Sequence, residues 1–193
     1  VSDATVSITN TPTIAELNLI AAETTGVVTA TLAADSLANL GALNTAGTDA
    51  ITITVNDANA AALTAANLSA LGGKTAGTVT VTNAVAITGD HDQVTAALVT
   101  AGTKVEVDDA TVTINDANAT EITAAELSAI GGATLGTVTV TNAVAIEGTE
   151  AEVTAALVTA GTKVEVDDAT VSITNTPTIA ALNLIAAETA GVV

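Results

Sequence analysis

Two acidic pairs occupy the same place in a repeated pattern, Asp108-Asp109 and Asp167-Asp168. Each pair follows a Lys-Val-Glu-Val stretch, at a position that we interpret as a turn. Carboxylate oxygens suit calcium, and stacked repeats would bring such turns near one another. The sequence therefore predicts weak calcium candidates at Asp108, Asp109, Asp167 and Asp168, and no other cofactor. The alternative is that aspartate suits turn geometry and accepts from local N–H groups, since no full set of roughly six to eight oxygen ligands is visible.

The single histidine, His91, lies between Asp90 and Asp92. An imidazole flanked by aspartates is a candidate metal ligand or general base. One repeat later the same positions hold Thr149-Glu150-Ala151, so the repeat does not require a histidine. We expect a surface histidine at a helix start. No nucleophile, base and orienting group cluster or repeat, so we predict no catalytic residue and no enzyme.

Threonines alternate with valines and isoleucines along several stretches. Side chains two apart share one face of a strand, so these hydroxyls would form a grid spaced by about 4.7–4.9 Å between strands. Such a grid resembles the ice-binding faces of β-solenoid antifreeze proteins. The alternative is that threonine is the β-branched residue that tolerates water. Besides Thr29 and Thr31, the predicted grid contains Thr52, Thr54, Thr78, Thr80, Thr82, Thr111, Thr113, Thr137, Thr139 and Thr141.

Charge and composition exclude several classes of protein. The chain has 21 acidic and 3 basic residues, for a formal net charge of −18. Contacts to phosphates need many cations, and Lys74, Lys104 and Lys163 are the only ones, so we expect no nucleic-acid partner. The longest uncharged stretch, 127–146, is interrupted by glycines, which argues against membrane insertion. The chain has no cysteine, which removes disulfides and thiolate sites.

Internal repeats are the main feature of the sequence. Residues 77–114 return as 136–173, and residues 55–77 return as 114–136, both at the same offset along the chain. Each unit divides into two halves that run strand, polar turn, short helix and glycine. The chain is therefore an array of related units, either a fragment of a longer array or an engineered array of copied units.

The first and last segments of the sequence are also near-copies. Residues 1–28 and 166–193 match at 25 of 28 positions, and they differ at Ser2/Asp167, Glu16/Ala181 and Thr25/Ala190. This likeness predicts end-to-end self-association of copies of the chain through apolar cross-sections, a contact that need not close. The acidic charge opposes it, less so at high salt.

Local patterns place the elements within each half. Alternation of valine and threonine predicts strands, and apolar residues three and four apart predict helices near 118–130 and 150–159. Thr13 with Glu16, and Thr123 with Glu126, have the spacing of a capping box. Glycines after the helices are predicted to close them in the left-handed conformation: Gly26, Gly47, Gly77, Gly102, Gly136, Gly161 and Gly191.

Strands separated by single helices predict parallel pairing through right-handed crossovers. We therefore predict an α/β fold: a right-handed α/β solenoid of about seven strand–helix coils with parallel β ladders along one side. The array is one domain over 1–193, with coils at about 1–26, 27–47, 48–77, 78–102, 103–136, 137–161 and 162–193. The side chains expected in the core are Val6, Ile8, Ile53, Val79, Val81, Val112, Ile114, Val138, Val140, Val171 and Ile173.

The strand 137–141, the turn Asn115-Asp116-Ala117-Asn118 and the return 160–163 resemble the alanine- and threonine-rich α/β-solenoid repeats of large bacterial surface or secreted proteins, cyanobacterial and RTX-like ones among them. The calcium nonapeptide of RTX β-rolls is missing, because no aspartate follows Gly131-Gly132 at the required position.

The resemblance implies a non-catalytic spacer or adhesion array, displayed outside the cell or on its surface if the protein is natural; for an engineered array it implies no location. A calcium-stabilised adhesin repeat and an ice-binding solenoid are the alternatives. An extracellular ligand would fit an adhesion role, and the resemblance does not specify one.

Overall fold

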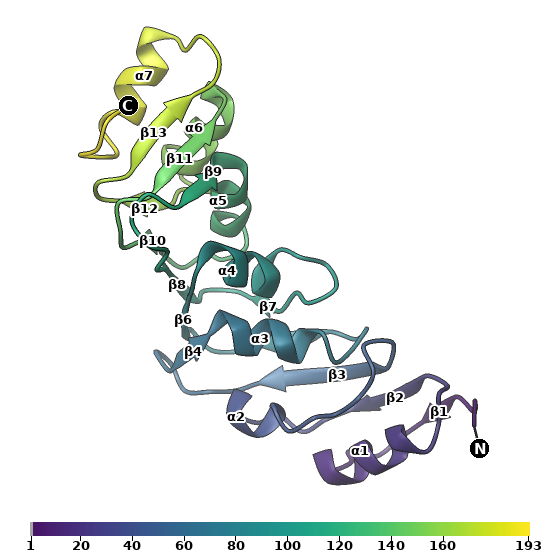
Figure 1. Cartoon of the computed structure of the whole chain (residues 1–193). Coiled ribbons are helices and arrows are strands. Elements are labelled where there is room, and N and C mark those ends of the chain that lie inside the picture. The colour runs from purple at the N-terminus through teal and green to yellow at the C-terminus, as the bar shows by residue number, and fades with distance from the viewer. Residues whose placement is uncertain (1) are drawn as a thin grey trace.

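The computed structural model describes residues 2–193, in which seven helices alternate with thirteen short strands along an elongated stack (Figure 1). No helix in these residues is long and apolar enough to cross a membrane. The helices are α1 (Ile14–Ala22), α2 (Leu37–Leu40), α3 (Ala65–Gly72), α4 (His91–Leu98), α5 (Ala124–Gly131), α6 (Glu150–Leu157) and α7 (Ile179–Ile185). The strands are β1 (Val6–Ser7), β2 (Val28–Thr31), β3 (Ala50–Val55), β4 (Ala62–Thr64), β5 (Val79–Val81), β6 (Ala86–Gly89), β7 (Glu106–Val107), β8 (Thr111–Ile114), β9 (Glu121–Thr123), β10 (Val138–Val140), β11 (Ala145–Gly148), β12 (Glu165–Val166) and β13 (Thr170–Ile173).

The strands form three sheets, and every strand pair in residues 2–193 is parallel. The first sheet has the order β1-β2-β3-β5-β7, the second β12-β10-β8-β6-β4, and the third β13-β11-β9. None of them closes into a barrel within the described part of the chain. The predicted α/β class with parallel pairing is confirmed.

The strands do not stay in one ladder, because the pairing step and the sequence repeat differ. Thr54 pairs with Thr80, and Thr80 pairs with Glu106, in two equal steps along the chain. The chain then continues from Glu106 to Thr113, in the next strand, before this pairing resumes. Thr113 pairs with Thr139, which lies the same number of residues further along the chain. One full repeat, from Thr80 to Thr139, therefore consists of the step to Glu106, the continuation to Thr113 and the step to Thr139. Strand β8 consequently pairs with β6 on one edge and β10 on the other, so the sheets are staggered.

Alternating burial along the strands builds the core. Side chains two apart share one face, and in β3 the buried residues Ile51, Ile53 and Val55 alternate with more exposed ones. Eight of the eleven predicted core residues are buried. The other three, Val6, Ile8 and Ile173, pack against the core but stay partly exposed. They lie in the outermost segments, where a neighbour covers one side only.

Capping boxes form where their spacing predicted them. Thr13 and Glu16 begin α1, Thr123 and Glu126 begin α5, and the same arrangement begins α6. The helix predicted at 118–130 was placed too early. Residues 121–123 pair with β11 as strand β9, so the helix begins only at Ala124. The helix predicted to reach residue 159 ends at Leu157.

The predicted left-handed glycines are wrong, since no glycine in residues 2–193 has a positive φ. The glycines before the strands are required by close contact instead. A Cβ atom on Gly136 would lie 2.2 Å from the carbonyl oxygen of Ala110, and one on Gly77 would lie 2.3 Å from that of Ile51. By contrast, a Cβ atom on Gly102 or Gly161 would meet nothing within 4 Å.

This contrast predicts opposite outcomes for two similar changes. Gly136→Ala should lower the free energy of unfolding by about 1–3 kcal/mol, because the backbone of the neighbouring segment must move. Gly161→Ala should leave it unchanged or raise it by about 0.4–1 kcal/mol, since it only restricts the unfolded chain. Urea unfolding followed by circular dichroism measures both, as the chain has no aromatic fluorophore. Equal losses in the two variants would contradict this account.

Candidate functional site

His91 and Asp116 form an enclosed polar contact between neighbouring segments. His91 is the first residue of α4, and Asp116 lies in the loop after β8. The imidazole Nδ1 lies 2.7 Å from Asp116 Oδ1, and the His91 backbone N–H donates to Oδ2 at 2.7 Å. Asn142 donates to the Asp116 carbonyl oxygen at 2.6 Å. The Asp116 carboxylate therefore contacts His91 of the segment before it, and its backbone carbonyl accepts from Asn142 of the segment after it.

The environment of His91 favours the protonated imidazole. Burial of the ring lowers its pKa, but the hydrogen bond and charge of Asp116, together with the charges of Asp92 and Glu126, outweigh burial and raise the pKa of His91 above 6.5. The side chain is only 14% exposed, so the expected surface histidine is in fact largely covered, although it does begin a helix as predicted.

The same backbone contact recurs in the other units without a histidine. Asp57 accepts from the backbone N–H of Leu37 at 2.7 Å, and Asn175 accepts from that of Glu150 at 2.7 Å. Because Asp57, Asp116 and Asn175 lie one repeat apart from each other in turn, they hold equivalent positions. The recurring element is thus a side-chain oxygen that caps the helix of the preceding segment. The sequence signal for this cap is that Asp57, Asp116 and Asn175, each with a side-chain oxygen, occupy the same repeat position.

The two predicted calcium pairs are not brought together. Asp108 and Asp109 follow β7 in the first sheet, whereas Asp167 and Asp168 follow β12 in the second. All four residues are exposed, and the backbone carbonyl oxygens of Asp108 and Asp167 accept from the N–H groups of Leu135 and Ala190, each at 2.7 Å. In residues 2–193 no group of three or more histidine or acidic side chains is placed to hold a metal ion.

The equivalent residue in the earlier unit, Asp49, behaves differently. It is 4% exposed, and its two carboxylate oxygens accept from the backbone N–H groups of Val28 at 2.8 Å and Ala46 at 2.9 Å. Its carboxylate thus satisfies one backbone N–H of the neighbouring segment and one of its own turn. The sequence pattern did not predict this role for Asp49.

The threonine face is interrupted by carboxylates. One row across neighbouring strands joins Thr64, Thr88, Thr113 and Thr139, and it ends at Glu165. Thr64 and Thr88 were not among the predicted residues. Of the predicted ones, Thr52, Thr78, Thr82, Thr111, Thr137 and Thr141 are exposed, and Thr54, Thr80, Thr113 and Thr139 are partly exposed. The structure thus presents a mixed surface of hydroxyls and carboxylates.

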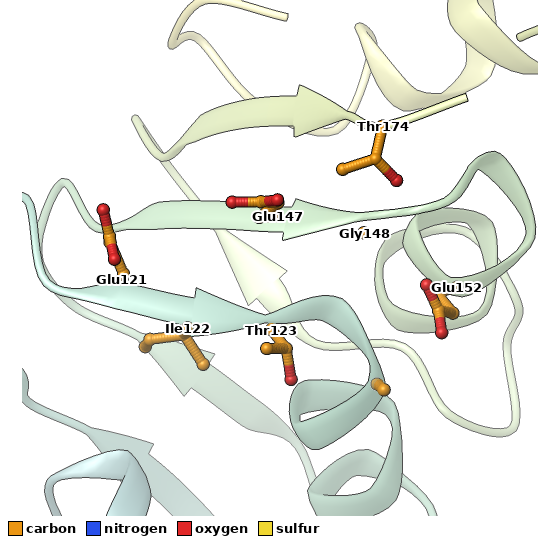
Figure 2. A pocket seen from close by; sticks show the side chains of 8 residues that line it. Glu121, Ile122, Thr123, Glu147, Gly148, Glu152 and Thr174 are labelled. Atoms are coloured by element: carbon orange, nitrogen blue, oxygen red, sulfur yellow. The ribbon is translucent and has the colours of Figure 1, made fainter. Parts of the chain in front are cut away.

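An open hollow of about 570 Å³ lies beside β9, β11 and the starts of α5 and α6. Its carboxylates, from Glu121, Glu147 and Glu152, are spread along it and do not meet at one point (Figure 2). Glu152 accepts from the backbone N–H of Thr149 at 2.8 Å and from its hydroxyl at 2.9 Å, and these bonds lower the pKa of Glu152. Its carboxylate is thereby kept ionised and committed to the helix cap.

His91 should make stability depend on pH. Because its folded pKa is raised, its stabilising effect is complete below the ordinary value of 6.5 and is lost as pH rises through the folded pKa. The free energy of unfolding should therefore fall on going from mildly acidic to mildly alkaline solution. Urea unfolding across this range measures the slope, and His91→Gln should remove it.

Asp116→Asn is the matched control for that effect. It keeps an oxygen to accept the His91 N–H, as Asn175 does for Glu150, but it removes the charge that favours imidazolium. The pH slope should shrink while the capping contact stays. A slope that survives in both variants would show that other groups produce it.

Calcium is expected to act only through screening. The chain carries a net charge of −18, and the candidate aspartates are exposed, so calcium and magnesium at equal ionic strength should raise the melting temperature equally. Asp108→Asn combined with Asp167→Asn should leave most of that rise. A larger rise with calcium, lost in the double variant, would establish a specific site.

Comparison of the chain with protein-family models, with curated proteins and with solved structures finds no match. The features that recur are contacts between segments, whereas the histidine and the carboxylates of the hollow occur in single units.

Proposed function

We propose that the chain is a non-catalytic structural array, a right-handed α/β solenoid of about seven strand–helix coils that acts as a spacer or scaffold. The single observation that carries this proposal is the repeated cap from one segment to the one before it. Asp57, Asp116 and Asn175 perform it for α2, α4 and α6, each at 2.7 Å. A unit that is completed by its neighbour is the basis of a solenoid.

Variation between the units favours a scaffold over a localised site. The acidic residues of the hollow, Glu121, Glu147 and Glu152, correspond to Ala62, Thr88 and Gln93 one unit earlier. These neutral residues sit on the same strands and helix starts of the preceding unit. The same strands and helix start thus form with neutral side chains at all three positions, so the carboxylates of the hollow are not a repeated functional set.

Right-handed winding follows from the general preference of parallel strands joined by a crossover. The resemblance to alanine- and threonine-rich bacterial repeats extends the proposal to a spacer or adhesion segment of a large surface or secreted protein, or an engineered array based on one. The net charge of −18 suits a long array that must remain soluble.

Duplicating one unit tests the proposal. Inserting a second copy of residues 77–135 after residue 135 preserves the repeat phase. A solenoid should lengthen by about 10 Å on the strand side and by up to about 20 Å on the helix side, since it gains two coils. Small-angle X-ray scattering measures the increase, and circular dichroism shows whether helix content grows in proportion.

A phase-shifted insertion of equal length, residues 90–148 at the same place, provides the control. It should interrupt the ladders and lower the melting temperature. If the in-phase variant became no longer than the parent, or lost its cooperative unfolding, the solenoid proposal would be wrong.

A further inference from the structure

Residues 2–28 and 167–193 share several internal hydrogen bonds. The Thr24 hydroxyl donates to the Ala4 carbonyl at 2.6 Å, and the equivalent Thr189 hydroxyl donates to that of Ala169 at 2.7 Å. The backbone N–H groups of Gly26 and Gly191 donate to these same hydroxyls, two residues earlier in each case, at 3.0 Å. The two segments therefore share these internal contacts as well as most of their sequence.

They differ in the side on which a neighbour covers them. Within residues 2–193, strand β1 pairs only with the strand that follows it, β2, whereas β13 pairs only with β11, from the segment before it. An open hollow of about 350 Å³ beside β1 is lined by Val6, Ile20 and Thr24 among others. Their counterparts Val171, Ile185 and Thr189 are buried. The hollow on the first segment thus corresponds to the surface that the last segment buries against the segment before it.

The surface that receives residues 166–193 consists of Val144, β11, Glu150 and Lys163, and we refer to it as the acceptor surface. Thr170 and Thr174 donate backbone N–H groups to the carbonyl oxygens of Val144 and Gly148 at 2.9 Å. Asn175 caps Glu150, and Lys163 pairs with Glu188 at 2.7 Å. The counterparts of these four docking residues are Thr5, Thr9, Asn10 and Glu23, which are identical in type.

One of the three sequence differences affects this docking. Thr178 donates its backbone N–H to Glu150 at 2.8 Å, across the boundary between segments. The equivalent Thr13 donates to Glu16 of its own helix at 2.9 Å, and alanine replaces that glutamate at 181. In residues 1–28, Glu16 would compete with Glu150 for the same donor and repel it. Glu16 therefore disfavours docking of the first segment without altering its shape.

We propose that the acceptor surface can bind residues 1–28 of a second copy in place of the chain's own residues 166–193, so that copies join head to tail by segment exchange. The chain's own residues 166–193 normally occupy the acceptor surface, because their effective concentration is of about millimolar order and they have alanine where the first segment has Glu16. Exchange leaves another acceptor surface at the far end of the incoming copy, so the assembly need not close.

The test uses the full chain with two changes. Ile185→Asp places a charge at a position with 0% exposure and releases the chain's own last segment. Glu16→Ala gives the first segment the residue found at 181. Sedimentation velocity of this double variant should show a weight-average mass that rises at least about twofold with protein concentration. Glu16→Ala alone should remain monomeric.

Two further variants separate exchange from aggregation of a loosened segment. Adding Ile20→Asp to the double variant damages the incoming segment and should abolish the mass increase. Lys163→Glu in the double variant should weaken association by about three- to fivefold, and a compensating Glu23→Lys should restore it. Association that persists with Ile20→Asp, is indifferent to the charge swap, or is absent from the double variant would overturn the proposal.

Discussion

Parallel pairing places successive strands about 4.7–4.9 Å apart, and this short spacing governs which residues each segment can contain. Backbones of neighbouring segments touch where the chain enters a strand, which is why Gly136 meets the carbonyl of Ala110. The core of these segments consists of aliphatic side chains such as Val138 and Ile146, and the sequence has no aromatic residue. Thin segments of this kind bury little surface alone, so stability must come from stacking.

Helices cannot follow the same spacing, because packed helices lie about 8–10 Å apart. The strand direction changes between β3 and β13 along the stack (Figure 1). Between Glu106 and Thr113 the chain leaves the pairs of the first sheet and begins those of the second. A staggered succession of short sheets thereby accommodates two elements with different preferred spacings.

Much of the fold could be predicted from the sequence because it is encoded locally and repeatedly. The alternation around Val79 and Val81 shows the buried face, and Thr123 with Glu126 marks a helix start. Contacts between segments could not be predicted from these local patterns. Asp49 and Asp108 occupy one repeat position, yet only the Asp49 carboxylate accepts from the neighbouring backbone, at Val28, and also from Ala46 of its own turn. The burial of His91 likewise depends on Asp116, which belongs to the following segment.

The caps provided by Asp57, Asp116 and Asn175 all point backward along the chain, from a later segment to an earlier helix. Removing a later segment deprives a helix N–H of its acceptor, whereas removing an earlier segment deprives a side-chain oxygen of one donor, and water can replace either partner once it is exposed. The order in which the caps break therefore depends on the end from which the stack unfolds. Unfolding from the last segment breaks the cap on α6 first and that on α2 last, and unfolding from the first segment breaks them in the reverse order.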